Sequence, residues 1–200
     1  MKTTSRNRAV LRFVAVLGAV ILGVSCKNDY VPKPKAYMRI AVPQKQYRDF
    51  DSAAYGFAFR LPVYASVQAV PVKKEYANTQ WLDICVPSLN AKIYLSYVRK
   101  PNLDSCITST LFFIQRHMTK ATGVDEREIY EPENHRFGYL YHIKGRDVAS
   151  PYQFYLTDSN RHFVRGSLSF ATTPNNDSLA PLIEFLKTDI DTLLATWAWK

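Results

Sequence analysis

A cysteine close to the N-terminus stands in a setting that favours covalent lipid attachment. Cys26 follows an uncharged, mostly apolar run of thirteen residues, 13–25, and residues 1–12 carry four basic side chains and no acidic one. A membrane-spanning helix needs roughly 20 apolar residues, whereas the apolar core of a signal peptide needs about 7–15. The small Ser25 before the thiol is typical of bacterial sites where cysteine becomes a diacylglycerol thioether. We therefore predict that residues 1–25 are a signal peptide and that Cys26 carries the lipid.

This lipid-attachment motif departs from the usual pattern at one position. Bacterial motifs usually have leucine three residues before the cysteine, where this chain has Gly23, with Leu22 one position earlier. An ordinary secretory signal followed by an incidental cysteine is therefore the alternative. A permanent N-terminal membrane helix fits less well, because Lys27, Asp29 and Pro32 end the apolar run at once.

The densest polar cluster of the chain is Asp158-Ser159-Asn160-Arg161-His162, with Arg165 after it. As a catalytic site, Asp158 would orient His162 and Ser159 would be the nucleophile. The same residue types favour tight turns, because Asp, Ser and Asn side chains bond to nearby backbone groups. We favour the turn, since no catalytic motif such as Gly-x-Ser-x-Gly accompanies the cluster.

Two further cysteines, Cys85 and Cys106, could form a disulfide in an oxidising compartment. Closing the loop of about 20 residues between them would contribute roughly 3 kcal/mol in the chain-entropy model. Two separately buried thiols are the alternative. The four histidines are isolated and no Cys-x-x-Cys or His-Glu-x-x-His pattern occurs, so we expect neither a metal site nor a cofactor.

The basic character of the chain comes largely from its N-terminus. The formal net charge is +9, and four of the basic side chains lie within residues 1–12. The remaining charges are scattered, whereas nucleic-acid binding depends on clustered Lys and Arg. We therefore expect no nucleic-acid partner.

Short apolar and alternating segments predict an extensive β-sheet. Residues 81–86 and 91–98 alternate on either side of a Pro-Ser-Leu-Asn turn and predict a β-hairpin, with Ile93, Leu95 and Tyr97 facing inward. The other predicted strands span residues 37–42, 57–61, 137–143, 152–157 and 162–170, with a β-rich stretch at 63–72.

Two segments show the spacing of amphipathic helices. The first is predicted to start at Asn102 or Asp104 and to end near Gly123. Its apolar stripe is Ile107, Leu111, Ile114 and Met118, widened towards the core by Phe112 and Phe113. The second helix has the stripe Leu179, Leu182, Ile183, Leu186, Ile190, Leu193, Leu194 and Trp197. Trp199 lies about 200° around this helix from Trp197, which makes it a candidate protein contact.

The order strands, helix, strands, helix predicts an α+β fold, in which two amphipathic helices pack on an antiparallel sheet. We expect one domain over residues 37–200, preceded by an extended tether at 26–36 that contains Pro32 and Pro34. In element order alone, this arrangement is similar to the Mog1/PsbP-like sandwich.

Longer runs of the sequence resemble one bacterial family. Residues 153–168 (Gln-Phe-Tyr-Leu-Thr-Asp-Ser-Asn-Arg-His-Phe-Val-Arg-Gly-Ser-Leu), residues 26–35 and the Trp-Lys end are similar to the gliding-motility lipoprotein family GldD of Bacteroidota. The resemblance extends over nearly the whole chain after the predicted signal peptide. It transfers one functional position, the lipid-bearing cysteine, onto Cys26.

The resemblance implies a role in gliding motility and in type IX protein secretion. It implies no enzymatic activity and no small-molecule substrate, with other envelope proteins of this machinery as partners. We expect a palmitate-bearing membrane lipoprotein of the cell envelope that faces the periplasm, with the outer membrane and the inner membrane both open as its site. A periplasmic hydrolase using Asp158 and His162 is the first alternative. A small-ligand-binding module is the second, and it would need an apolar pocket of roughly 300 Å³ or more.

The lipid-attachment prediction can be tested by removing the thiol of Cys26. Cys26→Ala removes the thiol, so the protein should fail to incorporate labelled palmitate and should leave the membrane fraction, because two or three acyl chains are what makes such anchoring stable. Cell fractionation and metabolic labelling give the result. A Cys26→Ala variant that stays membrane-bound would contradict the prediction.

Overall fold

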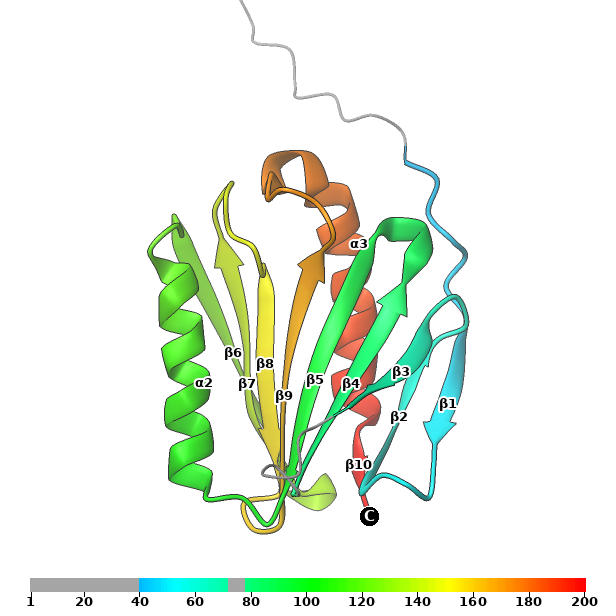
Figure 1. Cartoon of the computed structure of the whole chain (residues 1–200), viewed down its shortest axis with the longest axis vertical. Helices are drawn as coiled ribbons and strands as arrows, with labels where there is room; N and C mark the ends of the chain where they lie inside the picture. Colours follow the sequence, from blue (N-terminus) through cyan, green and yellow to red (C-terminus); the bar gives the residue numbers. More distant parts are fainter. Residues whose placement is uncertain (1–39, 72–77) are drawn as a thin grey trace, which may run out of the picture. The chain divides into compact units, whose positions relative to one another are not determined.

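A seven-stranded sheet forms the centre of the protein in the computed structural model, which describes residues 40–71 and 78–200. The strand order is β3-β4-β5-β9-β8-β7-β6, and every neighbouring pair is antiparallel (Figure 1). These strands are β3 (Ser66–Val70), β4 (Thr79–Val86), β5 (Ala91–Arg99), β6 (Gly123–Glu131), β7 (Arg136–Lys144), β8 (Tyr152–Thr157) and β9 (His162–Phe170). The predicted α+β class is confirmed.

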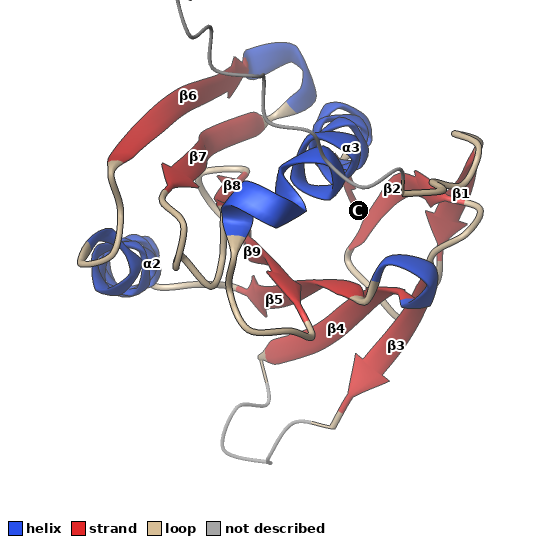
Figure 2. Cartoon of the chain, turned by 90° about the horizontal axis from the view of Figure 1, so that it is seen from above, coloured by secondary structure: helices blue, strands red, loops and turns tan. Residues whose placement is uncertain are grey.

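Two helices and a smaller sheet complete the described domain. The small sheet has the order β1-β2-β10 and consists of β1 (Tyr47–Asp51), β2 (Phe57–Pro62) and β10 (Ala198–Trp199). The helices α2 (Leu103–Met118) and α3 (Asn176–Thr196) lie on opposite faces of the large sheet (Figure 2). Short 3-10 turns, η2 (Pro87–Leu89) and η3 (Pro132–Asn134), join β4 to β5 and β6 to β7.

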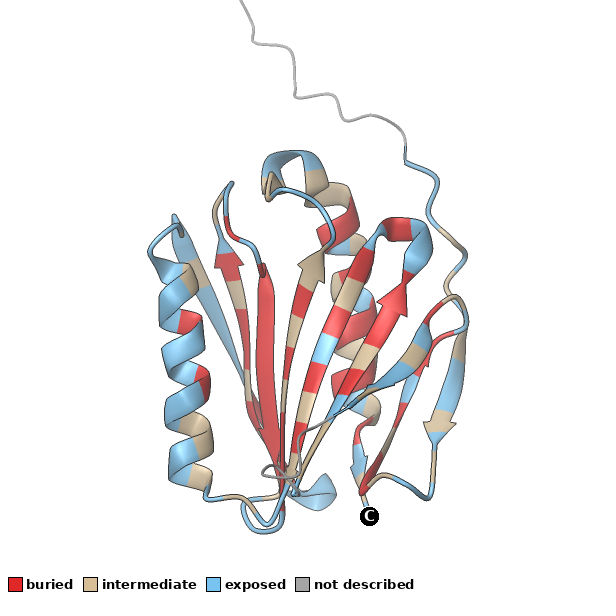
Figure 3. Ribbon diagram, in the orientation of Figure 1, coloured by how far each residue is buried: buried red, intermediate tan, exposed pale blue. Residues whose placement is uncertain are grey.

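The larger core lies between the sheet and α3. Alternate residues of β4 and β5 face α3, and the predicted inward set Ile93, Leu95 and Tyr97 is at most 3% exposed. The α3 stripe is buried against them, and Trp197 stacks on Phe57 of β2. Figure 3 shows this buried zone along the central strands and α3. The predicted hairpin and the second helix are therefore confirmed.

A second, smaller core lies between the other face of the sheet and α2. Its buried members are Ile114, Tyr141, Ile143, Val148, Tyr155 and Phe163. These side chains come from α2 and from the β7–β8–β9 part of the sheet, apart from Val148 in the β7–β8 loop. On this face, α2 thus covers only one half of the sheet.

The Asn102 N-cap of α2 is confirmed, and so is the core side of its predicted stripe at Ile107 and Ile114. The prediction is wrong for the other members, Leu111, Phe112, Phe113 and Met118. Asn102 accepts a hydrogen bond from the Ser105 N–H, but only Thr110 and Ile114 of the helix are buried. Leu111 and Met118, predicted to face the core, are 40% and 46% exposed. The buried side is rotated by roughly 60° from the predicted stripe, at 100° per residue. The apolar residues on this helix therefore include a set that its own domain does not bury.

Two sequence boundaries also differ from prediction. Residues 40–42 of the predicted first strand are not in a strand, and residues 37–39 lie outside the described part; the first strand is β1 instead. Gly123 does not end a helix but begins β6, which has the sequence Gly-Val-Asp-Glu-Arg-Glu-Ile-Tyr-Glu. This edge strand is largely exposed, so it lacks the apolar alternation that marks a strand in sequence, and pairing with β7 determines it.

A buried carboxylate fastens the start of the described chain to α3. Asp189 is 2% exposed and accepts hydrogen bonds from Lys45 at 2.5 Å, Tyr47 at 2.9 Å and Tyr64 at 2.5 Å. The Lys45 ammonium also lies 3.6 Å from the centre of the Phe185 ring. Burial raises the pKa of Tyr64, and the nearby carboxylate raises it further. This cluster therefore connects two segments, residues 45–47 and the loop after β2, to α3 through one side chain.

Replacing this carboxylate should destabilise the fold. Asp189→Ala leaves the Lys45 charge and two tyrosine hydroxyls without their acceptor, so the free energy of unfolding should fall by about 2–4 kcal/mol. Asp191→Ala is the matched control on the same helix, since its pair with Arg127 is largely exposed and should contribute at most about 1 kcal/mol. Urea denaturation of both variants measures the difference. If both variants lost the same free energy of unfolding, the Asp189 cluster would contribute no more to stability than the Asp191–Arg127 pair.

Candidate functional site

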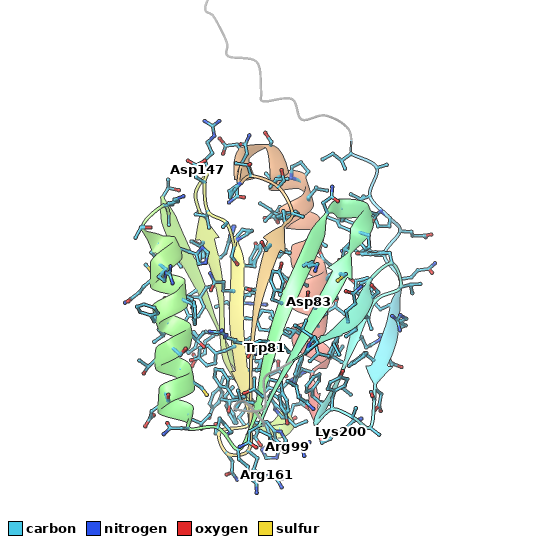
Figure 4. The ribbon with its side chains drawn as sticks, viewed as in Figure 1. Trp81, Asp83, Arg99, Asp147, Arg161 and Lys200 are labelled. Carbon is cyan, nitrogen blue, oxygen red and sulfur yellow. The ribbon has the colours of Figure 1, made fainter. Side chains whose placement is uncertain are left out.

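The polar cluster predicted from sequence forms the β8–β9 turn at one end of the sheet. One carboxylate oxygen of Asp158 accepts three backbone hydrogen bonds, from Asn160 at 3.0 Å and from Arg161 and His162 at 2.8 Å. Figure 4 shows Arg161 at this end, together with Arg99 and Lys200. The carboxylate therefore shapes the turn, as the Asp, Ser and Asn composition predicts.

His162 is buried behind this turn and bonded to a tyrosine. Its Nδ1 lies 2.6 Å from the Tyr97 hydroxyl, and its Nε2 lies 4.0 Å from the second Asp158 oxygen. Among the described residues, Tyr97 is the one hydrogen-bond partner of the ring. Ser159 has a φ of 65° and donates its N–H to Thr157 Oγ1, with no bond from its hydroxyl to the imidazole. The arrangement thus lacks the nucleophile–base contact of a hydrolase.

The charge states of this pair follow from burial and backbone donors. Burial lowers the pKa of His162 below its ordinary value, with Asp158 acting in the opposite direction. For Asp158, burial acts to raise the pKa, but the three backbone N–H groups outweigh it and hold the pKa below the usual range. At neutral pH the imidazole is therefore neutral and the carboxylate ionised.

Trp199, the candidate protein contact, is only partly accessible. The backbone becomes extended at Trp197, so Trp199 pairs with β2 as part of β10 instead of continuing the helix. Its ring stacks on His162 at 5.4 Å, and its indole N–H donates to the His135 carbonyl at 2.8 Å. The helical geometry assumed from sequence does not apply there, and most of the ring's contacts are within its own domain.

The outer side of α2 exposes four large apolar side chains. Leu111, Phe112, Phe113 and Met118 are 40%, 57%, 39% and 46% exposed. Phe112 and Phe113 pack edge to face, with ring centres 6.1 Å apart. We call these four residues the α2 outer face. At 100° per residue, Phe112 points away from the sheet, with Leu111 and Met118 on one flank of the helix and Phe113 on the other. Large apolar side chains left in water around the outer side of a helix make this surface a candidate interaction site.

A groove runs between α2 and the half of the sheet that α2 does not cover. It has a volume of about 370 Å³ and receives side chains from β4, β5, β8, β9 and α2. Trp81, Tyr94 and Phe113 supply aromatic walls, and Arg165 supplies a guanidinium. The polar cluster noted in sequence ends with Arg165, but the strand alternation sends this side chain to the opposite face from His162.

The family model for the gliding motility lipoprotein GldD matches residues 27–199. The chain belongs to this family. Among curated proteins, none matches the chain. Membership of the GldD family makes the protein a membrane-anchored lipoprotein of the cell envelope with a gliding-related role. The match includes the α2 outer face, the groove and the β8–β9 turn.

Two of the three cysteines of this GldD-family chain lie in the described part. Cys85 is buried on β4 and Cys106 is half-buried on α2, and both are free thiols in the structure. Cys26, the predicted lipid carrier, lies outside the described residues. Within residues 40–71 and 78–200, no group of three or more His, Cys, Asp or Glu could hold a metal ion. No helix in that part is long and apolar enough to cross a membrane.

The buried neutral histidine predicts a loss of stability in acid. The unfolded chain takes up a proton on His162 below about pH 6.5, whereas the folded state resists it, so the folded state loses its advantage as the pH falls. The free energy of unfolding should therefore decrease less between pH 7 and pH 5 in His162→Gln than in the natural protein.

Guanidinium denaturation at several pH values measures this slope. Tyr97→Phe is the control, because it removes the hydrogen bond and keeps the titrating imidazole, so its stability should still fall towards pH 5. If His162→Gln and the natural protein lose stability in parallel, burial of this imidazole does not contribute to acid sensitivity.

Proposed function

We propose that this protein is a non-catalytic component of the gliding motility and type IX secretion machinery that acts through protein–protein contacts. Lipid on Cys26 would anchor it in the outer membrane, with the domain facing the periplasm. The α2 outer face carries the proposal, because it is an apolar surface on a helix whose opposite side is already packed.

The energetics of α2 favour a protein partner. Burying a large apolar side chain contributes about 1.5–3 kcal/mol relative to leaving it in water. Phe112, at 57% exposed, points away from the buried Thr110 and Ile114 and so has no place in the domain core. A helix with one face packed and aromatic side chains on the other is suited to docking in a partner's groove. Aromatic residues are also enriched at the centres of interfaces.

The non-catalytic part of the proposal is supported by the β8–β9 turn. Asp158 accepts hydrogen bonds from three backbone donors and His162 is bonded to Tyr97, which supports a structural role for both side chains. The alternative of a periplasmic hydrolase would need an accessible hydroxyl nucleophile within hydrogen-bond reach of the imidazole, whereas the Tyr97 hydroxyl belongs to a side chain that is 1% exposed. The hydroxyl of Ser159 makes no such contact.

Polar substitutions on α2 should disrupt partner binding without unfolding the domain. The double variant Phe112→Ser and Met118→Ser should reduce crosslinking of the domain to envelope proteins by about tenfold or more, as removal of interface hot spots does. Gliding of colonies and secretion of surface adhesins should fall with it. Crosslinking in cells, followed by mass spectrometry, and measurements of colony spreading give these results.

Val63→Ser is the matched control for the α2 substitutions. Val63 is 53% exposed and apolar but lies in the loop after β2, away from α2. It should leave crosslinking and gliding at the level of the natural protein. Normal crosslinking and gliding in the α2 double variant, with its thermal unfolding unchanged, would contradict the proposed contact surface.

A further inference from the structure

The floor of the groove is made by two neighbouring rows of the antiparallel sheet. Strand pairing places Ser167 between Gln153 and Tyr94 in one row, and Ser96 between Arg165 and Trp81 in the next. The two serines are the smallest side chains of these rows, so the floor is low between larger neighbours. α2 forms the opposite wall with Phe113 and His117, whereas Trp81 and Asp83 lie on the open side of β4 (Figure 4).

Gln153 is buried at the inner end of the groove with an unused donor. The residue is 5% exposed, and its side-chain Nε2 has no hydrogen-bond partner among the described residues. Buried amide groups almost always have a partner, because losing hydrogen bonds to water without replacement costs about 1–3 kcal/mol. Since Gln153 lines the groove, a ligand there is placed to accept this hydrogen bond.

Arg165 brings a partly desolvated cation to the same place. Its guanidinium carbon lies 4.3 Å from the centre of the Phe113 ring, and the described residues form no ion pair with it. Burial lowers the pKa of Arg165, with the nearby Cys106 acting in the opposite direction. Guanidinium groups in such settings bind planar anions through two parallel N–H bonds.

The other ionisable side chains of the groove do not neutralise Arg165. Asp83 is paired with Lys92 at 3.0 Å on the open side of the sheet. Burial lowers the pKa of His117, and Arg116 lowers it further, so this imidazole is neutral at pH 7. Within residues 40–71 and 78–200, the groove therefore combines a cation without an ion pair, an amide donor, two serine hydroxyls and aromatic walls.

We infer that this groove binds a small organic acid, with its carboxylate on Arg165 and Gln153 and a flat apolar body between Trp81, Tyr94 and Phe113. One guanidinium with one amide donor suits the two oxygens of a carboxylate, whereas phosphate sites usually gather several cations. The volume of about 370 Å³ is that of a small-ligand site. This site is separate from the α2 outer face except at Phe113 and does not depend on the proposed partner contact.

The inference can be tested by titrating 1-naphthoate into the full-length lipidated protein in phosphatidylcholine nanodiscs. Isothermal titration calorimetry, with empty nanodiscs as the blank, should show saturable binding. The uncharged analogue 1-naphthalenemethanol should bind at least tenfold more weakly, because it lacks the carboxylate. Arg165→Gln should weaken naphthoate binding by a similar factor, and Arg165→Lys should recover only part of it.

A second variant, in the floor of the groove, tests the inference independently of Arg165, whose replacement could disturb the packing of α2. Ser167→Phe should fill the groove and abolish binding. Ser169→Phe is the matched control, because it lies on the same strand and the same face but outside the groove, and it should bind normally. Thermal unfolding identifies any variant that fails to fold.

Three results would overturn the inference. The first is no saturable naphthoate binding by the natural protein. The second is equal binding of the alcohol and the acid, and the third is equal binding by the Ser167→Phe and Ser169→Phe variants. An acetylated peptide that ends in a phenylalanine carboxylate is titrated in parallel. If only the peptide binds, and its binding depends on Arg165, the groove recognises a chain terminus and the free-acid inference is wrong.

Discussion

The seven-stranded sheet has apolar side chains on both of its faces, and α2 and α3 are the described helices available to cover them. The face towards α3 is covered along its central strands, where the small β1-β2-β10 sheet packs as well. On the opposite face α2 covers the β7–β8–β9 part and leaves β3, β4 and β5 open. The uneven cover produces both the groove beside α2 and the exposed aromatic residues of β4 and β5, Trp81 and Tyr94.

The end of α3 is fixed by one buried arginine, and this arrangement places Trp199 against His162. Arg136 of β7 donates hydrogen bonds to the carbonyls of Leu194, Ala195 and Trp197, and it forms an ion pair with Glu131. A cation at the C-terminus of a helix is also favoured by the helix dipole. With the helix ended there, the chain turns into β10 and its last tryptophan closes over His162.

The polar clusters and the exposed surfaces of the described domain differ in whether their groups already have partners within it. The β8–β9 turn and the Asp189 cluster are internally satisfied polar groups, which is typical of structural roles. The α2 outer face, by contrast, leaves large apolar side chains exposed to water. The groove contains a buried amide donor, Gln153 Nε2, that has no hydrogen-bond partner among the described residues. A lipid anchor at Cys26 would hold this GldD-family protein at a membrane of the cell envelope.

The sequence by itself determined whatever depends on local period or composition. It predicted the β4–β5 hairpin, the α3 stripe, the Asn102 cap and the β8–β9 turn, because each is encoded within a few consecutive residues. The signal peptide and the lipid on Cys26 stay predictions, because residues 1–26 lie outside the described part. The sequence also contained the family resemblance that the matching family model confirms. Only the tertiary structure decided which side of α2 is buried, that Gly123 begins an exposed edge strand, and that Trp199 leaves the helix. Those outcomes depend on neighbours distant in the chain, namely Tyr155 and Phe163 against α2, β7 beside β6, and Arg136 at the end of α3. For the same reason, it became visible only once the strands were paired that Arg165 and Gln153 line the same groove.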